Sequence, residues 1–263
     1  MLQSNYVIAF AIAAMLAAGS TQAAVVTVTG GTGSPTASSW GVLPGENSAG
    51  ASAVITASQP RNGNGSVELS GDRTRFQLGI QYGGGTNLLA LSGVTGLSFD
   101  WRIAGDSISG YNPDYTPALR LLVQDGSRRS ELIWEGVYNG TYGNTQRDTW
   151  YSTSFADNFY QFVAGSGVTL VNGSQSNKTI ASWISQNYSA NAFVSGLSVG
   201  DGSGALTTYH AFADTVSLGT TSGTTTYNFE VAAGTAVPEP ASMALLLTGF
   251  GVAGLVRRRR AIR

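Results

Sequence analysis

Hydrophobic and polar positions alternate along most of the chain between residues 24 and 219. In residues 97–103 (LSFDWRI), every odd position is apolar and every even position is polar. A period of two is typical of a β-strand that buries one face, and a slip of one residue there would expose four large side chains. The same alternation recurs at Val67/Leu69, Phe76/Leu78/Ile80 with Arg75/Gln77 opposite, Leu119/Leu121/Val123, Leu132/Trp134, Phe193/Leu197/Val199, Phe212/Val216/Leu218 and Tyr227/Phe229/Val231. We therefore predict that strands dominate, with Trp101 and Trp134 in the core.

The segments between these alternating runs predict tight turns and one helix. Asn-Gly, Asp-Gly and triple-glycine sequences separate the runs and supply the positive-φ positions that short connections need. Between residues 177 and 188, Ile180, Trp183, Ile184 and Tyr188 follow the spacing of one helical face. About ten short strands with this turn spacing predict an all-β, two-sheet β-sandwich or jelly roll. The single short helix is expected to cap one edge or end of it.

The chain divides into four parts on this interpretation: a signal peptide (1–23), a β-sandwich domain (24–219), a spacer (220–236) and a C-terminal signal (237–263). Residues 219–226 (GTTSGTTT) are rich in Gly, Ser and Thr, which is typical of a flexible linker. Residues 227–232 alternate like a strand. We expect this last segment either to pair back onto the domain or to remain a loose stalk.

The composition of the 263 residues excludes several chemistries. There is no cysteine, so thiol nucleophiles, cysteine-ligated metals and disulfides are excluded. His210 is the single histidine, which excludes a zinc site built on several imidazoles. Between residues 24 and 236 there are nine Lys or Arg and fourteen Asp or Glu, a formal charge of −5. We therefore predict no nucleic-acid partner, because phosphate binding needs a basic stripe.

The N-terminus has the pattern of a secretory signal peptide. An apolar run of twelve residues, 7–18, is followed by small and polar residues that lead to Ala23. We predict cleavage by signal peptidase after Ala23. The segment departs from the usual pattern because residues 1–6 contain no Lys or Arg. The alternative is a buried core helix, since a run this short does not span a bilayer.

The C-terminus combines three features within 27 residues. Val237, Pro238, Glu239 and Pro240 precede an apolar segment at 241–256, and a block of arginines follows at once. Sixteen helical residues reach about 24 Å, against a hydrocarbon core of about 30 Å, so the segment is a marginal transmembrane helix. Arginines at its end mark the cytoplasmic side and leave the body of the protein outside.

This order of features resembles the PEP-CTERM sorting signal of Gram-negative bacteria. The resemblance implies that a membrane-embedded exosortase recognises the segment and processes it near the prolines. It also implies export, transient anchoring, and a final place at the cell surface or in an extracellular matrix beside exopolysaccharide. An ordinary C-terminal tail anchor is the alternative, although it leaves the proline pair unexplained. The residues predicted to carry sorting are Val237, Pro238, Glu239, Pro240, Arg257, Arg258, Arg259 and Arg260.

Glu131 and Glu135 form the most suggestive catalytic pattern. On a strand they share a face, and paired carboxylates are what glycoside hydrolysis requires. The spacing is similar to the Glu-x-Asp-x-Glu strand of laminarinase-type jelly-roll glycosidases, but Ile133 stands where that family has its middle Asp. The simpler interpretation is two solvated carboxylates on the outer face of a strand. We accordingly predict no catalytic residue and no enzymatic activity.

Aromatic residues among Asn, Gly and Thr are the predicted binding residues, because exposed rings can stack on sugars. They are Trp150, Tyr151, Tyr138 and Tyr142, and the loop tyrosines Tyr111 and Tyr115 share this context. The alternative is that such rings pin long loops to the core.

No cofactor is predicted, although a structural calcium is considered at Asp201 and Asp214. Jelly-roll domains often hold calcium near their terminal strands, but Asp201-Gly202 is more simply a turn. Asp214 lies in phase with apolar neighbours, which predicts a bulge or a buried carboxylate. His210 is expected to be structural.

The sequence therefore predicts an exported surface or matrix protein. Its β domain is expected to be a non-catalytic structural or carbohydrate-binding module associated with extracellular polysaccharide. A jelly-roll glycoside hydrolase or lyase, and a protein-binding adhesin, are the alternatives.

Overall fold

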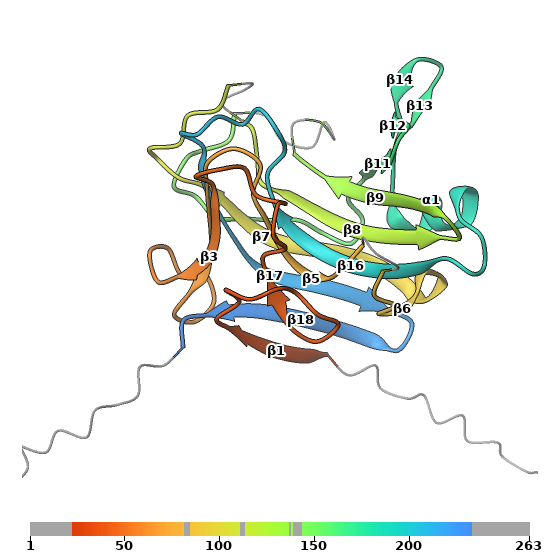
Figure 1. Cartoon of the computed structure of the whole chain (residues 1–263), viewed down its shortest axis with the longest axis horizontal. Helices are drawn as coiled ribbons and strands as arrows, with labels where there is room; N and C mark the ends of the chain where they lie inside the picture. The colour runs from red at the N-terminus through yellow and green to blue at the C-terminus, as the bar shows by residue number, and fades with distance from the viewer. Residues whose placement is uncertain (1–22, 82–84, 111–113, 137, 139–143, 233–263) are drawn as a thin grey trace, which may run out of the picture.

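The computed structural model describes residues 23–81, 85–110, 114–136, 138 and 144–232. Within them the chain is mostly β-sheet, with two large sheets and one short α-helix (Figure 1). The predicted signal peptide, apart from Ala23, and the whole segment 237–263 lie outside the described residues. No helix in the described part of the chain has the length and apolar character needed to cross a membrane.

The first sheet has seven strands among the described residues. Its path runs through β1 (Ala24–Thr29), β18 (Gly223–Glu230), β17 (His210–Thr220), β4 (Ser66–Ser70) and β3 (Ser52–Thr56), and β7 (Val94–Ile103) pairs with both β17 and β10 (Tyr151–Ser152). All of these pairings are antiparallel except that of β1 with β18.

The second sheet has nine strands in the same described regions. Its path is β12 (Gly167–Val168), β11 (Phe159–Val163), β9 (Arg128–Trp134), β8 (Ala118–Asp125), β16 (Phe193–Gly200), β5 (Arg75–Gly79) and β2 (Trp40–Gly41). Two short strands extend it, since β15 (Asn177–Lys178) pairs with β11 and β6 (Leu89–Ala90) pairs with β16. A short 3₁₀ turn covers Leu91–Gly93, and β13 (Leu170–Val171) pairs with β14 (Ser174–Gln175) in a hairpin that projects from the body (Figure 1).

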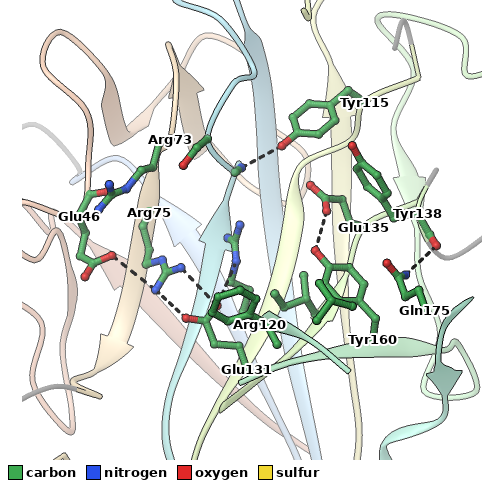
Figure 2. Close-up of a pocket in the computed structure, with 15 residues that line it drawn as sticks. Glu46, Arg73, Arg75, Tyr115, Arg120, Glu131, Glu135, Tyr138, Tyr160 and Gln175 are labelled. Carbon is green, nitrogen blue, oxygen red and sulfur yellow. Dashed lines mark hydrogen bonds and ion pairs between the residues drawn. The ribbon is translucent and has the colours of Figure 1, made fainter. Parts of the chain in front are cut away.

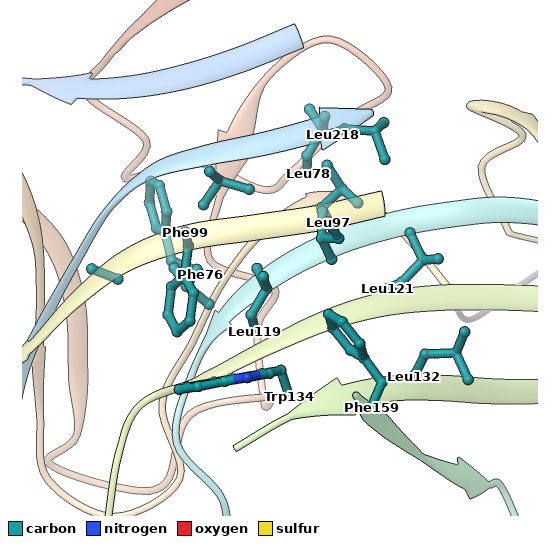
Figure 3. Close-up of a cluster of buried hydrophobic side chains, with 14 of the residues drawn as sticks. Phe76, Leu78, Leu97, Phe99, Leu119, Leu121, Leu132, Trp134, Phe159 and Leu218 are labelled. Carbon is teal, nitrogen blue, oxygen red and sulfur yellow. The ribbon is translucent and has the colours of Figure 1, made fainter. Parts of the chain in front are cut away.

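Both sheets contribute side chains to one hydrophobic core, which Figure 3 shows between them. Leu97 and Phe99 of β7 meet Leu119, Leu121 and Leu132 of the nine-stranded sheet. The predicted core positions of Trp101 and Trp134 are confirmed, since both are fully buried. Burying a side chain of this size contributes about 2 to 3 kcal/mol. The core therefore fixes which face of each strand points inward.

The register across β8 and β9 determines what lies on the outer face. Leu119 is opposite Trp134 and Leu121 is opposite Leu132, so these positions share the inner face. Because side chains alternate along a strand, Arg120, which lies between the two leucines, must point outward. The nine-stranded sheet consequently presents polar residues on its outer surface.

The predicted helix is present as α1 (Ile180–Asn187). Thr179 caps its N-terminus by accepting a hydrogen bond from the Ser182 amide at 3.3 Å. Ile180 and Trp183 are buried in the core, and the indole nitrogen of Trp183 donates to the carbonyl of Phe159 at 2.7 Å. The apolar spacing of the segment thus reflects real packing.

The interpretation of residues 219–226 as a flexible spacer is corrected by the structure. These residues complete β17, turn, and begin β18, which pairs antiparallel with β17 and parallel with β1. The segment folds because threonine favours extended backbone, and the hydroxyls of Ser217 and Thr226 lie 2.8 Å apart across the pair. The β domain accordingly extends to Glu230, and the alternating segment that begins at Tyr227 pairs back onto it.

Asp214 occupies a break in the seven-stranded sheet. The register of β17 shifts after this residue, where its partner changes from β4 to β18. The buried carboxylate accepts hydrogen bonds from the amides of Phe229 (3.0 Å), Asn62 (3.1 Å) and Thr215 (2.7 Å). Burial raises the pKa of Asp214 to about 6, although these amides act in the opposite direction. Asp214 is thus both a bulge residue and a buried carboxylate.

Asp201 plays a similar part at the end of β16. Its carboxylate accepts hydrogen bonds from the amides of Arg73 (2.9 Å) and Thr74 (2.8 Å) and from the Thr74 hydroxyl. Burial raises the pKa of Asp201 to about 6. Two buried aspartates therefore titrate well above the ordinary range.

We expect the free energy of unfolding to increase as the pH falls from about 7.5 to about 5. Asp201 and Asp214 bind a proton more tightly in the folded state, so their contribution is complete below pH 3.8 and is lost as the pH rises through about 6. Each contributes on the order of 2 to 3 kcal/mol, because one pKa unit corresponds to about 1.4 kcal/mol. Urea denaturation followed by tryptophan fluorescence measures the profile.

The variant Asp214→Asn should remove about half of this change, because the amide does not titrate while Asp201 still does. Asp148→Asn is the matched control, since hydrogen bonding from Arg102 lowers the pKa of Asp148 and removes it from this pH window. If the free energy of unfolding of the wild type is constant, or falls, between pH 7.5 and pH 5, the raised pKa values of Asp201 and Asp214 are contradicted.

Candidate functional site

A pocket of about 430 Å³ opens on the outer face of the nine-stranded sheet. Figure 2 shows that the arginines, Glu46 and Glu131 gather at one side of it, and that Glu135 lies at the other side among the tyrosines. The charged and aromatic residues that line it are Glu46, Arg73, Arg75, Arg120, Glu131, Glu135, Tyr115, Tyr138, Tyr160 and Phe162.

Strand register brings these side chains together. Arg120, Ile133 and Tyr160 lie opposite one another across β8, β9 and β11. Glu131 is two residues before Ile133 and Glu135 is two residues after it, so both glutamates lie on the pocket side of the same chain segment.

Glu131 is held by two arginines. Its carboxylate oxygens accept hydrogen bonds from Nη1 and Nη2 of Arg75 at 3.2 and 3.3 Å, which is a bidentate pair. Nε of Arg120 lies 3.6 Å from the same carboxylate, and Arg75 also approaches Glu46 at 3.6 Å. The Glu131 carboxylate is thus contacted by two guanidinium groups.

Arg120 is a buried cation, with only 4% of its surface exposed. Burial alone would lower the pKa of Arg120, but the charges of Glu131 and Glu135 outweigh this effect and raise it. Its Nη1 atom has no hydrogen-bond partner among the described residues. Leaving such a donor unpaired is costly, and this is common where a ligand completes a site.

Glu135 lies in a different environment. Its carboxylate accepts a hydrogen bond from the Tyr160 hydroxyl at 2.9 Å, and the Tyr115 hydroxyl also hydrogen-bonds to it. Burial raises the pKa of Glu135, although Arg120 and the two tyrosines act in the opposite direction. The pocket therefore contains one strongly paired carboxylate and one that is easier to protonate.

The expectation that Glu131 and Glu135 are solvated was wrong. They do lie on the outer face, but they are 8% and 4% exposed. The cause is the set of neighbours from distant parts of the chain, namely Arg75, Arg120 and Tyr160, which cover the carboxylates.

The predicted binding aromatics separate into different places. Tyr138 lines the pocket and is 43% exposed, and its carbonyl accepts a hydrogen bond from the Gln175 amide at 3.1 Å. Tyr115 also lines the pocket, but its side chain is buried. Its hydroxyl accepts a hydrogen bond from the Gly202 amide at 3.0 Å. Tyr111 and Tyr142 lie outside the described residues.

Trp150 and Tyr151 do not line the pocket. Tyr151 belongs to β10 of the seven-stranded sheet, and its ring stacks on Trp101 with centroids 4.7 Å apart. The guanidinium of Arg61 lies over Trp150 at 6.0 Å. Tyr151 therefore pins its segment to the core, which is the alternative role considered for these aromatic residues.

The structure offers no assembled calcium site in the described regions, where no group of three His, Asp or Glu side chains could hold a metal ion. The carboxylates of Asp201 and Asp214 are in separate sheets and accept hydrogen bonds from the chain itself. His210 lies between Asp106 (2.7 Å) and Glu68 (3.0 Å) at the edge of β17, outside the pocket.

Comparison with known protein families bears on the C-terminus. Residues 236–260 match the family model described as the PEP-CTERM protein-sorting motif. The chain carries a PEP-CTERM sorting motif. The match includes the residues predicted to carry sorting: Val237, Pro238, Glu239, Pro240, Arg257, Arg258, Arg259 and Arg260. The PEP-CTERM motif implies export, transient membrane anchoring through the C-terminal region, and processing by an exosortase.

The match to the PEP-CTERM motif gives no information about the β domain, because it begins at residue 236, after the last strand has ended at Glu230. No curated protein matches the chain. The function of the pocket must therefore be argued from its own residues.

Sequence reasoning missed Arg73, Arg75, Arg120 and Tyr160 as pocket residues. One signal was present, since Arg120 interrupts an otherwise apolar run at 118–123 in strand β8. An arginine in such a position needs a partner on the neighbouring strands, but the local pattern does not say which strands these are.

We expect Glu131→Gln to lower the free energy of unfolding by about 3 kcal/mol, because it removes the carboxylate that is ion-paired with the buried Arg120 and leaves only Glu135 to compensate its charge. The control is Glu46→Gln, which removes a single contact to Arg75 at 3.6 Å and should cost about 1 kcal/mol or less. Urea denaturation of both variants measures the difference. Equal costs would show that the pairing around Glu131 is not what stabilises the pocket.

Proposed function

We propose that this exported protein is a non-catalytic polysaccharide-binding module, built on a two-sheet sandwich. In this proposal signal peptidase removes the N-terminus and exosortase processes the C-terminal motif. The mature protein then resides at the cell surface or in the extracellular matrix, where the pocket binds polysaccharide.

The observation that carries the proposal is the combination of rings and paired charges in one pocket. Tyr138, Tyr160 and Phe162 offer ring surfaces on which the apolar face of a sugar can lie. Arg75 and Glu131 offer donors and acceptors that are already oriented by each other. Sugar hydroxyls can both donate and accept, so such a pair suits them.

Binding without turnover is favoured by the state of Glu131. A glycosidase nucleophile or base needs a free carboxylate oxygen, and both oxygens of Glu131 accept hydrogen bonds from Arg75. Nε of Arg120 also lies 3.6 Å from this carboxylate, so a second guanidinium restricts its approach to a sugar.

A glycoside hydrolase is the second candidate, because one observation favours it. Glu131 and Glu135 share one pocket in contrasting environments, and the raised pKa of Glu135 is what a general acid requires. In that mechanism Glu135 would protonate the glycosidic oxygen, and Glu131 would either attack the anomeric carbon as nucleophile or deprotonate the water that attacks it.

We expect the purified protein to be retained on an immobilised polysaccharide, with Tyr138→Ala weakening retention about tenfold because a stacked ring surface is lost. Trp150→Ala is the matched control and should bind like the wild type, since Trp150 does not line the pocket. Affinity electrophoresis against a panel of polysaccharides measures both. Equal losses, or loss only for Trp150→Ala, would exclude the pocket as the binding site.

The same samples are assayed for new reducing ends. Release that is abolished by Glu135→Gln would support the hydrolase and exclude simple binding. If no polysaccharide is retained or cleaved, a protein-binding adhesin becomes the better proposal.

We expect the extracellular form to lack the C-terminal segment, because exosortase processing removes the apolar helix and the arginines. Mass spectrometry of the intact secreted protein measures this. A double substitution, Pro238→Ala with Pro240→Ala, should leave an uncleaved membrane-bound form, whereas Pro60→Ala in an exposed loop should be processed normally. A secreted form that still carries Arg263 would contradict the processing model.

A further inference from the structure

The pocket gathers an unusual share of the positive charge of an acidic domain. Residues 24–236 contain nine Lys or Arg against fourteen Asp or Glu. Three of those nine, Arg73, Arg75 and Arg120, line this one pocket. Three carboxylates, Glu46, Glu131 and Glu135, line the same pocket, so its lining is formally neutral while the rest of residues 24–236 carries the whole formal charge of −5. An anion therefore meets less repulsion at the pocket than elsewhere on the domain.

Arg73 stands in a backbone conformation that a large side chain rarely adopts. Its φ angle is 55°, in the left-handed region. The surroundings hold it there, because Asp201 accepts its amide at 2.9 Å and the Arg73 carbonyl accepts from the Ser48 amide at 3.1 Å. Strain that the neighbouring structure maintains is typical of positions where a side chain must be presented to a ligand.

The guanidinium of Arg73 is fixed but its charge is not neutralised. It donates to the carbonyls of Glu46 (3.1 Å) and Gly45 (3.2 Å), and it forms no ion pair with a carboxylate among the described residues. Arg75 and Arg120, in contrast, share the charge of Glu131. Arg73 is also exposed at the mouth of the pocket, so an incoming anion can reach it.

The carboxylates near Arg73 are directed elsewhere. Glu46 approaches Arg75 at 3.6 Å, and Glu131 is paired with Arg75 at 3.2 Å. Glu135 lies deeper, against Tyr160, Tyr115 and Arg120 (Figure 2). The mouth is therefore the part of the pocket where positive charge is least compensated.

We propose that the pocket binds an acidic sugar, a hexuronate unit of a polysaccharide, and that Arg73 binds its carboxylate. This inference rests on the proposed polysaccharide-binding function and names the class of sugar. The planar guanidinium forms two parallel hydrogen bonds to a carboxylate, which gives an anionic unit an advantage over a neutral one.

The test compares each acid with its neutral ester. The probes are trimers of galacturonate, mannuronate and guluronate, each with the matching methyl-esterified trimer, titrated by calorimetry into the purified full-length protein at neutral pH. At least one acid should bind about tenfold more tightly than its ester, because only the carboxylate differs between them. Added salt should weaken binding of the acid and not of the ester.

Arg73→Asn is the deciding variant, because asparagine tolerates the left-handed backbone and removes the cation. It should bring the affinity for the acid to within about threefold of that for the ester. Arg128→Gln is the matched control, since Arg128 pairs with Asp125 outside the pocket, and it should keep the preference for the acid. Circular dichroism and thermal unfolding verify that both variants fold. The salt effect on the wild type provides a test that needs no substitution.

The outcomes separate the inference from the proposed function. Esters that bind as well as the acids, or no binding of any acid, overturn the acidic-sugar inference. Retention on neutral polysaccharides in either case keeps the proposed function. A preference for the acid that survives Arg73→Asn overturns the role of Arg73, and loss of all polysaccharide binding overturns both proposals.

Discussion

Packing between the two sheets is the constraint on which the pocket depends. Leu119, Leu121, Leu132 and Trp134 must all face the core, and that requirement excludes a slip of one residue between β8 and β9. Once the register is set, the intervening residue Arg120 has to face outward. The pocket is thus the outer side of the same strand pairs whose inner side forms the core, and a rearrangement of one face would destroy the other.

Charge in the pocket is stabilised locally rather than by solvent. Arg120 lies almost entirely out of water, and the cost of burying it is offset because Glu131 and Glu135 lie on the neighbouring segment. The two glutamates are not equivalent, however. Glu131 is held by two guanidinium groups, whereas Glu135 is held mainly by tyrosine hydroxyls and has a raised pKa. A network of this kind orients each donor and acceptor before a ligand arrives, which is the property that specific binding requires.

Local alternation of apolar and polar residues predicted the strands, the core tryptophans and the outward face of Glu131 and Glu135. It did not predict that these glutamates are buried, because the groups that cover them come from elsewhere: Arg75 is 56 positions away in the chain. Sheet order decides such contacts, and a pattern within one strand contains no information about it. For the same reason the sequence could not separate Tyr138 from Trp150: both lie among Asn, Gly and Thr, but only Tyr138 lines the pocket. The threonine-rich segment before Tyr227 was misread for another reason, since composition suggested a linker while its β-propensity and its partner β17 made it a strand.

The position of the last strand relates the pocket to the sorting motif. β18 ends at Glu230 in the seven-stranded sheet, while the pocket opens on the outer face of the other sheet. The match to the sorting motif begins at residue 236, so five residues, 231–235, separate β18 from it, a reach of at most about 20 Å. The chain therefore leaves the described domain from the sheet that lacks the pocket. The pocket lies on the opposite side of the core from the strand that leads to the sorting motif, so the two features are built on separate sheets.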